Sequence, residues 1–201
     1  FCVDLIRDIE PRYLESPAGI RDRTPETLEA LFEALIFTGI AMTIAGTSSP
    51  ASGGEHLVSH TLDMMSSVDG VEHDFHGRQV GVGTVLAAAL YREVLNLECP
   101  DFGYQETETD PDFWGPLTDA VEEHHRGKRE KCRAAVRALR ADPGLWDRLR
   151  EDLARRAPDP EQVRHCLKTA GAAHRYADLG IDRARFLTAF RHCHEIRERF
   201  T

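Results

Sequence analysis

Residues 45–88 read AGTSSPASGGEHLVSHTLDMMSSVDGVEHDFHGRQVGVGTVLAA. His56 and His60 are four positions apart, and His76 opens the next apolar run. Because positions i and i+4 share one face of a helix, both rings can point into one cavity, and the next helix can bring His76 to it. Neutral imidazole binds Zn or Fe well, and a catalytic metal usually has three protein ligands. The spacing therefore indicates a metal centre, with packed or surface histidines as the alternative interpretation.

The loop before His56 consists mostly of small residues, with Ser52 among them in the stretch 47–54. Small residues let the backbone approach a ligand closely. Free N–H groups at the start of the helix that follows would favour an anion such as phosphate. Glycines after His76 predict tight helix packing beside the site; they are Gly77, Gly81 and Gly83.

Length, composition, net charge and cysteine usage limit the classes of protein to which this chain can belong. The chain has 201 residues, enough for one domain with a sizeable core, with 41% hydrophobic and 29% charged residues. Its net charge of -9 argues against a nucleic-acid surface. Five dispersed cysteines suggest reduced thiols and a cytoplasmic location. We find no run of roughly 18 apolar residues and so expect no membrane span.

Helical periodicity runs through the whole chain, and no segment shows the alternation of a strand. We therefore predict an all-α bundle of about eight or nine helices, the first of them over residues 1–14. The helix over residues 25–44 is apolar nearly all round from Ala34 onward, which predicts a central buried helix. The basic face of residues 126–133, and His124 and His125 just before it, are interpreted as solvent-exposed.

The stretch 45–88 closely resembles the glycerol-1-phosphate dehydrogenases, which belong to the superfamily of iron-containing alcohol dehydrogenases, glycerol dehydrogenases and dehydroquinate synthases. Their pattern is GSSRPASGxEHxxSH followed by HGxQVGVGT. Ser49 and Arg78 depart from it, and a weaker likeness covers the rest of the chain, including the terminal HCHEIRERFT. The matching positions are Thr47, Pro50, Ala51, Ser52, Gly53, Glu55, His56, Ser59, His60, His76, Gly77, Gln79, Val80 and Gly81.

This resemblance implies roles for single residues. His56 and His76 would bind the metal, expected to be Zn, Fe or Ni. His60 would contact the substrate and pass a proton as the catalytic side chain, with Ser52 also at the substrate. The family's third ligand is an aspartate upstream of Phe1. His194, in the terminal motif, is a candidate neighbour of the site.

The resemblance also implies a two-domain, dehydroquinate-synthase-like enzyme. Residues 1–201 would be its C-terminal helical domain, which binds metal and substrate. An N-terminal α/β domain would bind NAD or NADP. This sequence has no strand–GxGxxG–helix unit, so we expect that domain to lie outside the chain and assign no cofactor-contacting residue within it. The chain alone should then be inactive.

The implied activity is a metal-dependent oxidoreductase. It would transfer hydride between NAD(P)H and dihydroxyacetone phosphate, or a related polyol or polyol phosphate, in the cytoplasm. Small molecules are the expected partners, and a homo-oligomer is left open. Two alternatives remain: a sugar phosphate cyclase like dehydroquinate synthase, which shares metal and NAD but has no net redox change, and a non-catalytic helical module.

Overall fold

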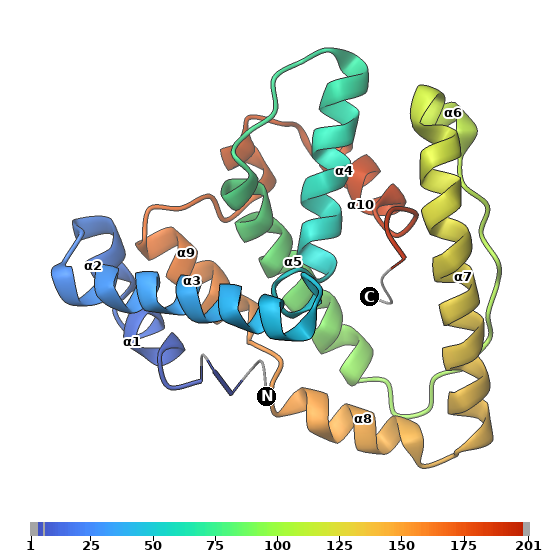
Figure 1. The fold of residues 1–201 in the computed structure, drawn as a ribbon, viewed down its shortest axis with the longest axis horizontal. Helices are drawn as coiled ribbons and strands as arrows, with labels where there is room; N and C mark the ends of the chain where they lie inside the picture. The colour runs from blue at the N-terminus through green and yellow to red at the C-terminus, as the bar shows by residue number, and fades with distance from the viewer. Residues whose placement is uncertain (1–3, 6, 199–201) are drawn as a thin grey trace.

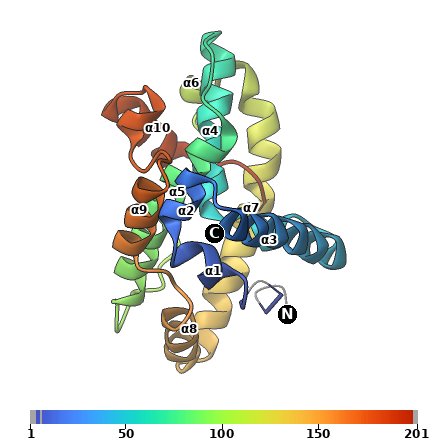
Figure 2. The same cartoon turned by 90° about the vertical axis from the view of Figure 1, so that its left-hand side faces the viewer.

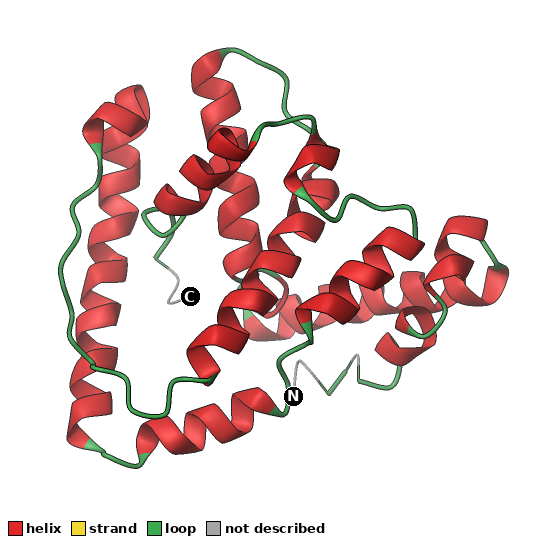
Figure 3. Cartoon of the chain, turned by 180° about the vertical axis from the view of Figure 1, so that it is seen from behind, coloured by secondary structure: helices red, strands yellow, loops and turns green. Residues whose placement is uncertain are grey.

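The computed structural model describes residues 4–5 and 7–198. That part of the chain contains α-helices and short 3-10 helices and no strand, as Figure 3 shows, which confirms the all-α prediction. Two very short helices, α1 and α6, take the number of α-helices to ten, above the eight or nine expected. The α-helices are α1 (Glu10–Leu14), α2 (Pro17–Asp22), α3 (Pro25–Ala45), α4 (Gly54–Asp69), α5 (His76–Leu95), α6 (Pro111–Trp114), α7 (Thr118–Ala141), α8 (Leu145–Ala154), α9 (Pro160–Thr169) and α10 (Arg183–His192). The 3-10 helices are η1 (Ser49–Ala51), η2 (Gly115–Leu117) and η3 (Tyr176–Leu179).

The helix predicted over residues 1–14 is shorter than expected. Its residues 1–3 and 6 lie outside the described part of the chain, and residues 4–5 and 7–9 form turns. The regular helix begins only at Glu10, directly before Pro11. Proline is favoured in the first turn of a helix because its missing N–H would have no intrahelical partner there.

The centre of the fold is the pair α4 and α5 (Figure 1). The two helices pack against each other, α10 covers α4, and α9 covers α5. Gly70, in the left-handed conformation, ends α4 and lets the chain turn back toward α5. The main hydrophobic core lies around α4, with buried members from α4 to α7, from α10, from η3 and the loop before it, and from the residues that follow α10: Leu57, Val58, Leu62, Val82, Trp114, Val121, Ala173, Leu179, Phe186, Ala189, Cys193 and Ile196.

Gly83 allows the close approach of α5 to α4. A Cβ at Gly83 would lie 2.6 Å from the carbonyl oxygen of Glu55, whereas a Cβ at Gly77 would meet nothing within 4 Å. We therefore expect Gly83→Ala to lower the free energy of unfolding by about 1–3 kcal/mol, the usual effect of overpacking. Gly77→Ala, the matched control, should be neutral or stabilising by up to about 1 kcal/mol. Urea unfolding of both variants measures the difference, and equal effects would contradict the close approach.

The prediction that residues 25–44 form a central buried helix is wrong. Figure 2 shows α3 extending outward from the α4–α5 pair. Its buried residues are small, including Ala30 and Ala34, and it packs on α1, while Phe32 is 68% exposed. An evenly apolar helix has no preferred face, so the packing of small side chains decided which side is covered. The other large apolar residues exposed on it are Leu28, Leu35, Ile36, Ile40 and Ile44.

By length and composition alone, α3 also qualifies as a membrane-spanning helix within the described residues. The expectation of no membrane span therefore does not follow from composition. A core helix of a soluble protein passes the same test, so this finding by itself is weak support for a membrane location.

The prediction of a fully solvent-exposed basic face on α7 is wrong at two positions. His125 is only 2% exposed and Lys128 is also buried, whereas His124 is exposed as expected. The cause is the C-terminal segment, residues 193–198, which lies against α7: Lys131 Nζ donates to the carbonyl oxygen of Glu198 at 2.9 Å. Burial lowers the pKa of the Lys128 ammonium.

Candidate metal and substrate site

Two helices bring the three predicted histidines together. His56 and His60 lie on one face of α4, and His76 is the first residue of α5. The ring centroids of His56 and His76 are 5.1 Å apart, those of His60 and His76 5.2 Å, and those of His56 and His60 6.0 Å. The structure thus assembles the imidazole cluster, defined here as His56, His60 and His76, that the i, i+4 spacing predicted.

Asp63 joins this cluster and was not predicted as a ligand. Candidate ligand atoms of His60, Asp63 and His76 all lie within 4.8 Å of one another. The Oδ1 atom of Asp63 is buried and accepts no hydrogen bond, although His73 Nδ1 is 3.3 Å away. A buried oxygen without a partner is costly, and a cation beside it would satisfy it, so these residues fit a divalent metal. The i, i+3 spacing from His60 is the sequence signal from which Asp63 could have been predicted.

Hydrogen bonds orient His76 as a ligand. The buried Ser59 hydroxyl donates to Gln79 Oε1 at 2.7 Å, and its oxygen lies 2.9 Å from His76 Nδ1. Because the Ser59 proton is used by Gln79, His76 Nδ1–H is the donor of the second bond. His76 then carries its free lone pair on Nε2, the atom that can bind a metal. Ser59 and Gln79 matched the family pattern, but their orienting role could not be read from it.

Glu55 orients His56 in a similar way. Its carboxylate is 2.8 Å from His56 Nδ1 and accepts the Gly53 N–H at 2.7 Å. Burial raises the pKa of the Glu55 carboxyl, but these hydrogen bonds outweigh it and keep the pKa below its usual value. A carboxylate on Nδ1 leaves Nε2 free for a metal. It also occupies the Gly53 N–H, which the sequence had suggested was open to an anion.

His60 is neutral near pH 7. Burial lowers its pKa to about 4, and the charges of Arg197, His76 and His56 add to the effect. A neutral imidazole keeps a lone pair for a metal or a substrate hydroxyl.

Two further residues, Ser52 and His194, were predicted for this site. Ser52 is buried, 8% exposed, at the end of the turn before α4. His194 is exposed, donates through Nδ1 to the carbonyl oxygen of Arg191 at 2.8 Å and is in edge contact with His125. The substrate role of Ser52 stays a prediction, and the contacts of His194 do not support it as a neighbour of the site.

A separate pocket of about 390 Å³ lies between α4 and the start of α10. Its wall includes His73, Gln79 and Arg185, and among its lining residues only Gln79 takes part in orienting the imidazole cluster. Because the converging metal-binding groups lie outside it, we place the chemistry at the cluster.

No protein-family model matches the chain. Curated proteins do match it: the chain is 52% identical over 71 residues to a protein of Korarchaeum cryptofilum named glycerol-1-phosphate dehydrogenase (NAD(P)+). The chain is thus similar in sequence to proteins named glycerol-1-phosphate dehydrogenase. A protein of the same name from Halalkalibacterium halodurans is 29% identical over 174 residues, 87% of this chain, and one from Natronomonas pharaonis is 29% identical over 188 residues, 94% of this chain.

The likeness covers 35% of this chain for the Korarchaeum protein and nearly all of it for the other two, but a minor part of each relative. The matches span 23%, 36% and 35% of the Korarchaeum, Halalkalibacterium and Natronomonas proteins, respectively. The chain therefore spans at most about a third of the length of these relatives.

Proposed function

We propose that this chain is the metal- and substrate-binding helical part of an NAD(P)-dependent oxidoreductase. The proposed reaction interconverts dihydroxyacetone phosphate and glycerol 1-phosphate, or a closely related polyol phosphate pair. The observation that carries the proposal is the convergence of His56, His60 and His76 beside the unsatisfied oxygen of Asp63. The printed name of the relatives supplies the substrate class.

His56 and His76 are the proposed metal ligands. Each has its Nδ1 atom hydrogen-bonded by a neighbour, Glu55 or Ser59, which leaves Nε2 unprotonated and fixes the ring. Asp63 offers a further ligand from this chain, within 4.8 Å of the ligand atoms of His60 and His76. Zn, Fe and Ni all accept such nitrogen and carboxylate donors. When bound, a divalent ion would polarise the carbonyl of the substrate and lower the pKa of its alcohol form.

His60 is the proposed catalytic side chain. Held neutral by burial and by neighbouring positive charge, it can hydrogen-bond the substrate hydroxyl and pass its proton. Ser52, buried just before α4, is proposed to close the substrate side of the site. The nicotinamide cofactor would supply the hydride. That this chain alone neither binds NAD(P) tightly nor turns over stays a prediction.

The test compares two histidines in the full-length protein. His56→Ala should lower NADPH oxidation with dihydroxyacetone phosphate by at least about a hundredfold, because it removes a ligand that orients the metal. His124→Ala is the matched control, since His124 is exposed on α7, and should retain activity within about twofold. Equal losses in the two variants would show that the site is misplaced.

Two other functions are weaker candidates. A sugar phosphate cyclase would use the same metal and NAD without net redox change, but the relatives found here are named dehydrogenases. A non-catalytic helical module has no need for an intact, oriented imidazole cluster.

A further inference from the structure

Helix α3 presents a continuous apolar face to solvent, on the side that extends away from the α4–α5 pair (Figure 2). Among the described residues it packs mainly on α1, α2 and η1, and the residues it buries are small: Thr27, Ala30, Ala34 and Ala41. Six large apolar residues of α3 are instead each between 40% and 68% exposed. We call them the α3 face: Leu28, Phe32, Leu35, Ile36, Ile40 and Ile44.

The α3 face is large for a surface that meets only water. With roughly half of each side chain exposed, its area is on the order of 600 Å², the upper end of the apolar patches that monomeric proteins expose. Patches of this size usually mark an interaction site. The α3 face therefore calls for a partner.

The shape of the α3 face fits another helix. Five of its members are spaced four residues apart, from Leu28 to Ile44, and so form one ridge along the helix. Beside this ridge a Cβ added at Gly39 would meet nothing within 4 Å, which leaves an open groove. A second helix can place its own ridge in such a groove, crossing at about −50°.

A lipid bilayer is a poor occupant of the α3 face. A membrane span needs lipid on all sides, whereas α3 is covered by protein along the side of Ala30 and Ala34. A helix that lies on a membrane surface usually carries Lys or Arg on its polar side. The sequence of α3 has neither, and its charged residues are glutamates, which anionic lipids repel.

A second copy of the chain is also a weaker occupant than a segment of the same polypeptide. Two α3 faces together would bury roughly 1,200 Å², the lower limit for a specific interface, and association also costs translational and rotational freedom. A segment of the same polypeptide avoids most of that cost. Two relatives that match 87% and 94% of this chain each have about two thirds of their length outside the match. A longer protein of this kind can supply the helix.

We propose that the α3 face is covered by a helix from the part of the full-length protein outside these 201 residues. The inference rests on the proposed function, which makes this chain one part of a longer enzyme. Gly46 ends α3, and η1 packs on α3 and leads directly into α4, the helix that carries His56 and His60. Docking on α3 thus joins the rest of the protein to the element that enters the imidazole cluster.

The experiment measures cysteine labelling by N-ethylmaleimide in the full-length protein, with each site followed by peptide mass spectrometry. Ile36→Cys and Ile40→Cys place a thiol on the α3 face, and Val94→Cys, at a position 45% exposed on α5, is the matched control. We expect the thiols at 36 and 40 to react at least about a hundredfold more slowly than the thiol at 94, because covered sites react only through local opening. The buried Cys193 should stay unlabelled in each variant, which shows that the fold is retained.

Dilution and added lipid identify the occupant. Protection that is unchanged over a hundredfold dilution supports a helix of the same polypeptide. Protection that disappears on dilution to monomers would assign the α3 face to a second copy. Protection that appears only with phosphatidylglycerol vesicles would assign it to a membrane, and either result overturns the proposal.

Activity of the same full-length protein keeps this inference distinct from the proposed function. If the wild-type protein oxidises NADPH with dihydroxyacetone phosphate while the thiols at 36 and 40 react as fast as the thiol at 94, only the docking proposal is overturned. If these thiols are protected at every dilution and the protein has no such activity, the docking proposal is supported and the proposed function fails.

Discussion

Replacing His76 by alanine should leave the full-length protein without a stoichiometric metal ion and lower the proposed dehydrogenase activity by about a thousandfold. His76 lies within reach of every other candidate ligand: its ring is close to His56 and His60, and its ligand atom is within 4.8 Å of that of Asp63. Ser59 also fixes its tautomer. Metal analysis of the purified variant, together with glycerol 1-phosphate oxidation, measures both effects. Undiminished stoichiometric metal in His76→Ala would rule the site out.

The same metal analysis decides which residues complete the site. We expect His56→Ala to lower metal affinity as strongly as His76→Ala, since Glu55 orients His56 for this role. Asp63→Asn should weaken metal binding by roughly 10–100-fold if its free oxygen faces the ion. His124→Ala is the control, because His124 is exposed on α7, away from these residues in the sequence. Retained metal in His56→Ala with loss in His60→Ala would instead assign the metal to His60, Asp63 and His76.

The fold class was predictable because helical periodicity is a local property of the sequence. Periodicity does not show which side of a helix is buried when more than one side could be. The helix α3 is apolar on all sides, so only the position of its neighbours determines that Ala30 is covered while Phe32 is exposed. His125 was predicted on the surface because its sequence neighbours are charged. It is buried because residues 193–198, far away in sequence, pack on α7.

The candidate site was also predictable only as far as local sequence spacing determines it. The i, i+4 pair and the histidine at the start of the next helix were sufficient to predict that three rings meet. The buried Asp63 oxygen that accepts no hydrogen bond and the Ser59–Gln79 hydrogen bond both depend on side-chain geometry that spacing does not specify.

Glu195→Ala should lower the free energy of unfolding by about 3–5 kcal/mol, the usual cost of breaking a buried, hydrogen-bonded charge. The substitution leaves the indole N–H of Trp114 and the backbone N–H of Asp110 without their acceptor. It also removes the partner of His192 and opens a cavity in the main core. Urea unfolding monitored by the fluorescence of the buried Trp114 is a direct measurement, since the indole ring reports on the same contact.

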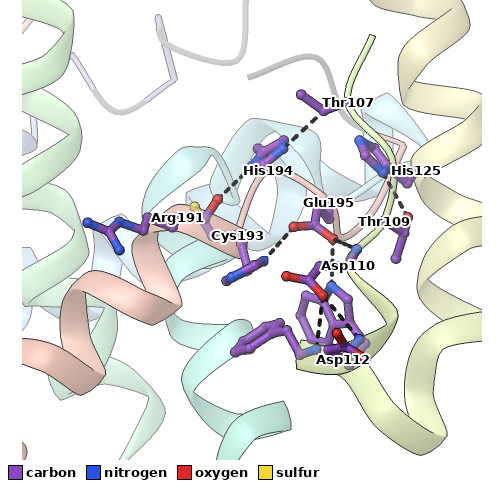
Figure 4. A network of polar contacts seen from close by, with 12 residues as sticks. Thr107, Thr109, Asp110, Asp112, His125, Arg191, Cys193, His194 and Glu195 are labelled. Carbon is purple, nitrogen blue, oxygen red and sulfur yellow. Dashed lines mark hydrogen bonds and ion pairs between the residues drawn. The ribbon is translucent and has the colours of Figure 1, made fainter.

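Glu198→Ala is the matched control in the same segment. Its carboxylate is 3.3 Å from Lys131 Nζ, but both side chains are 52% exposed, so water screens the pair and the expected loss is at most about 1 kcal/mol. A large difference between the two glutamates would show that burial and convergent donors, and not charge alone, hold the C-terminal segment in place. If Glu195→Ala cost no more than Glu198→Ala, the buried hydrogen bonds of Glu195 (Figure 4) would not be what holds the segment in place, and the packing of Ile196 would be the remaining contribution.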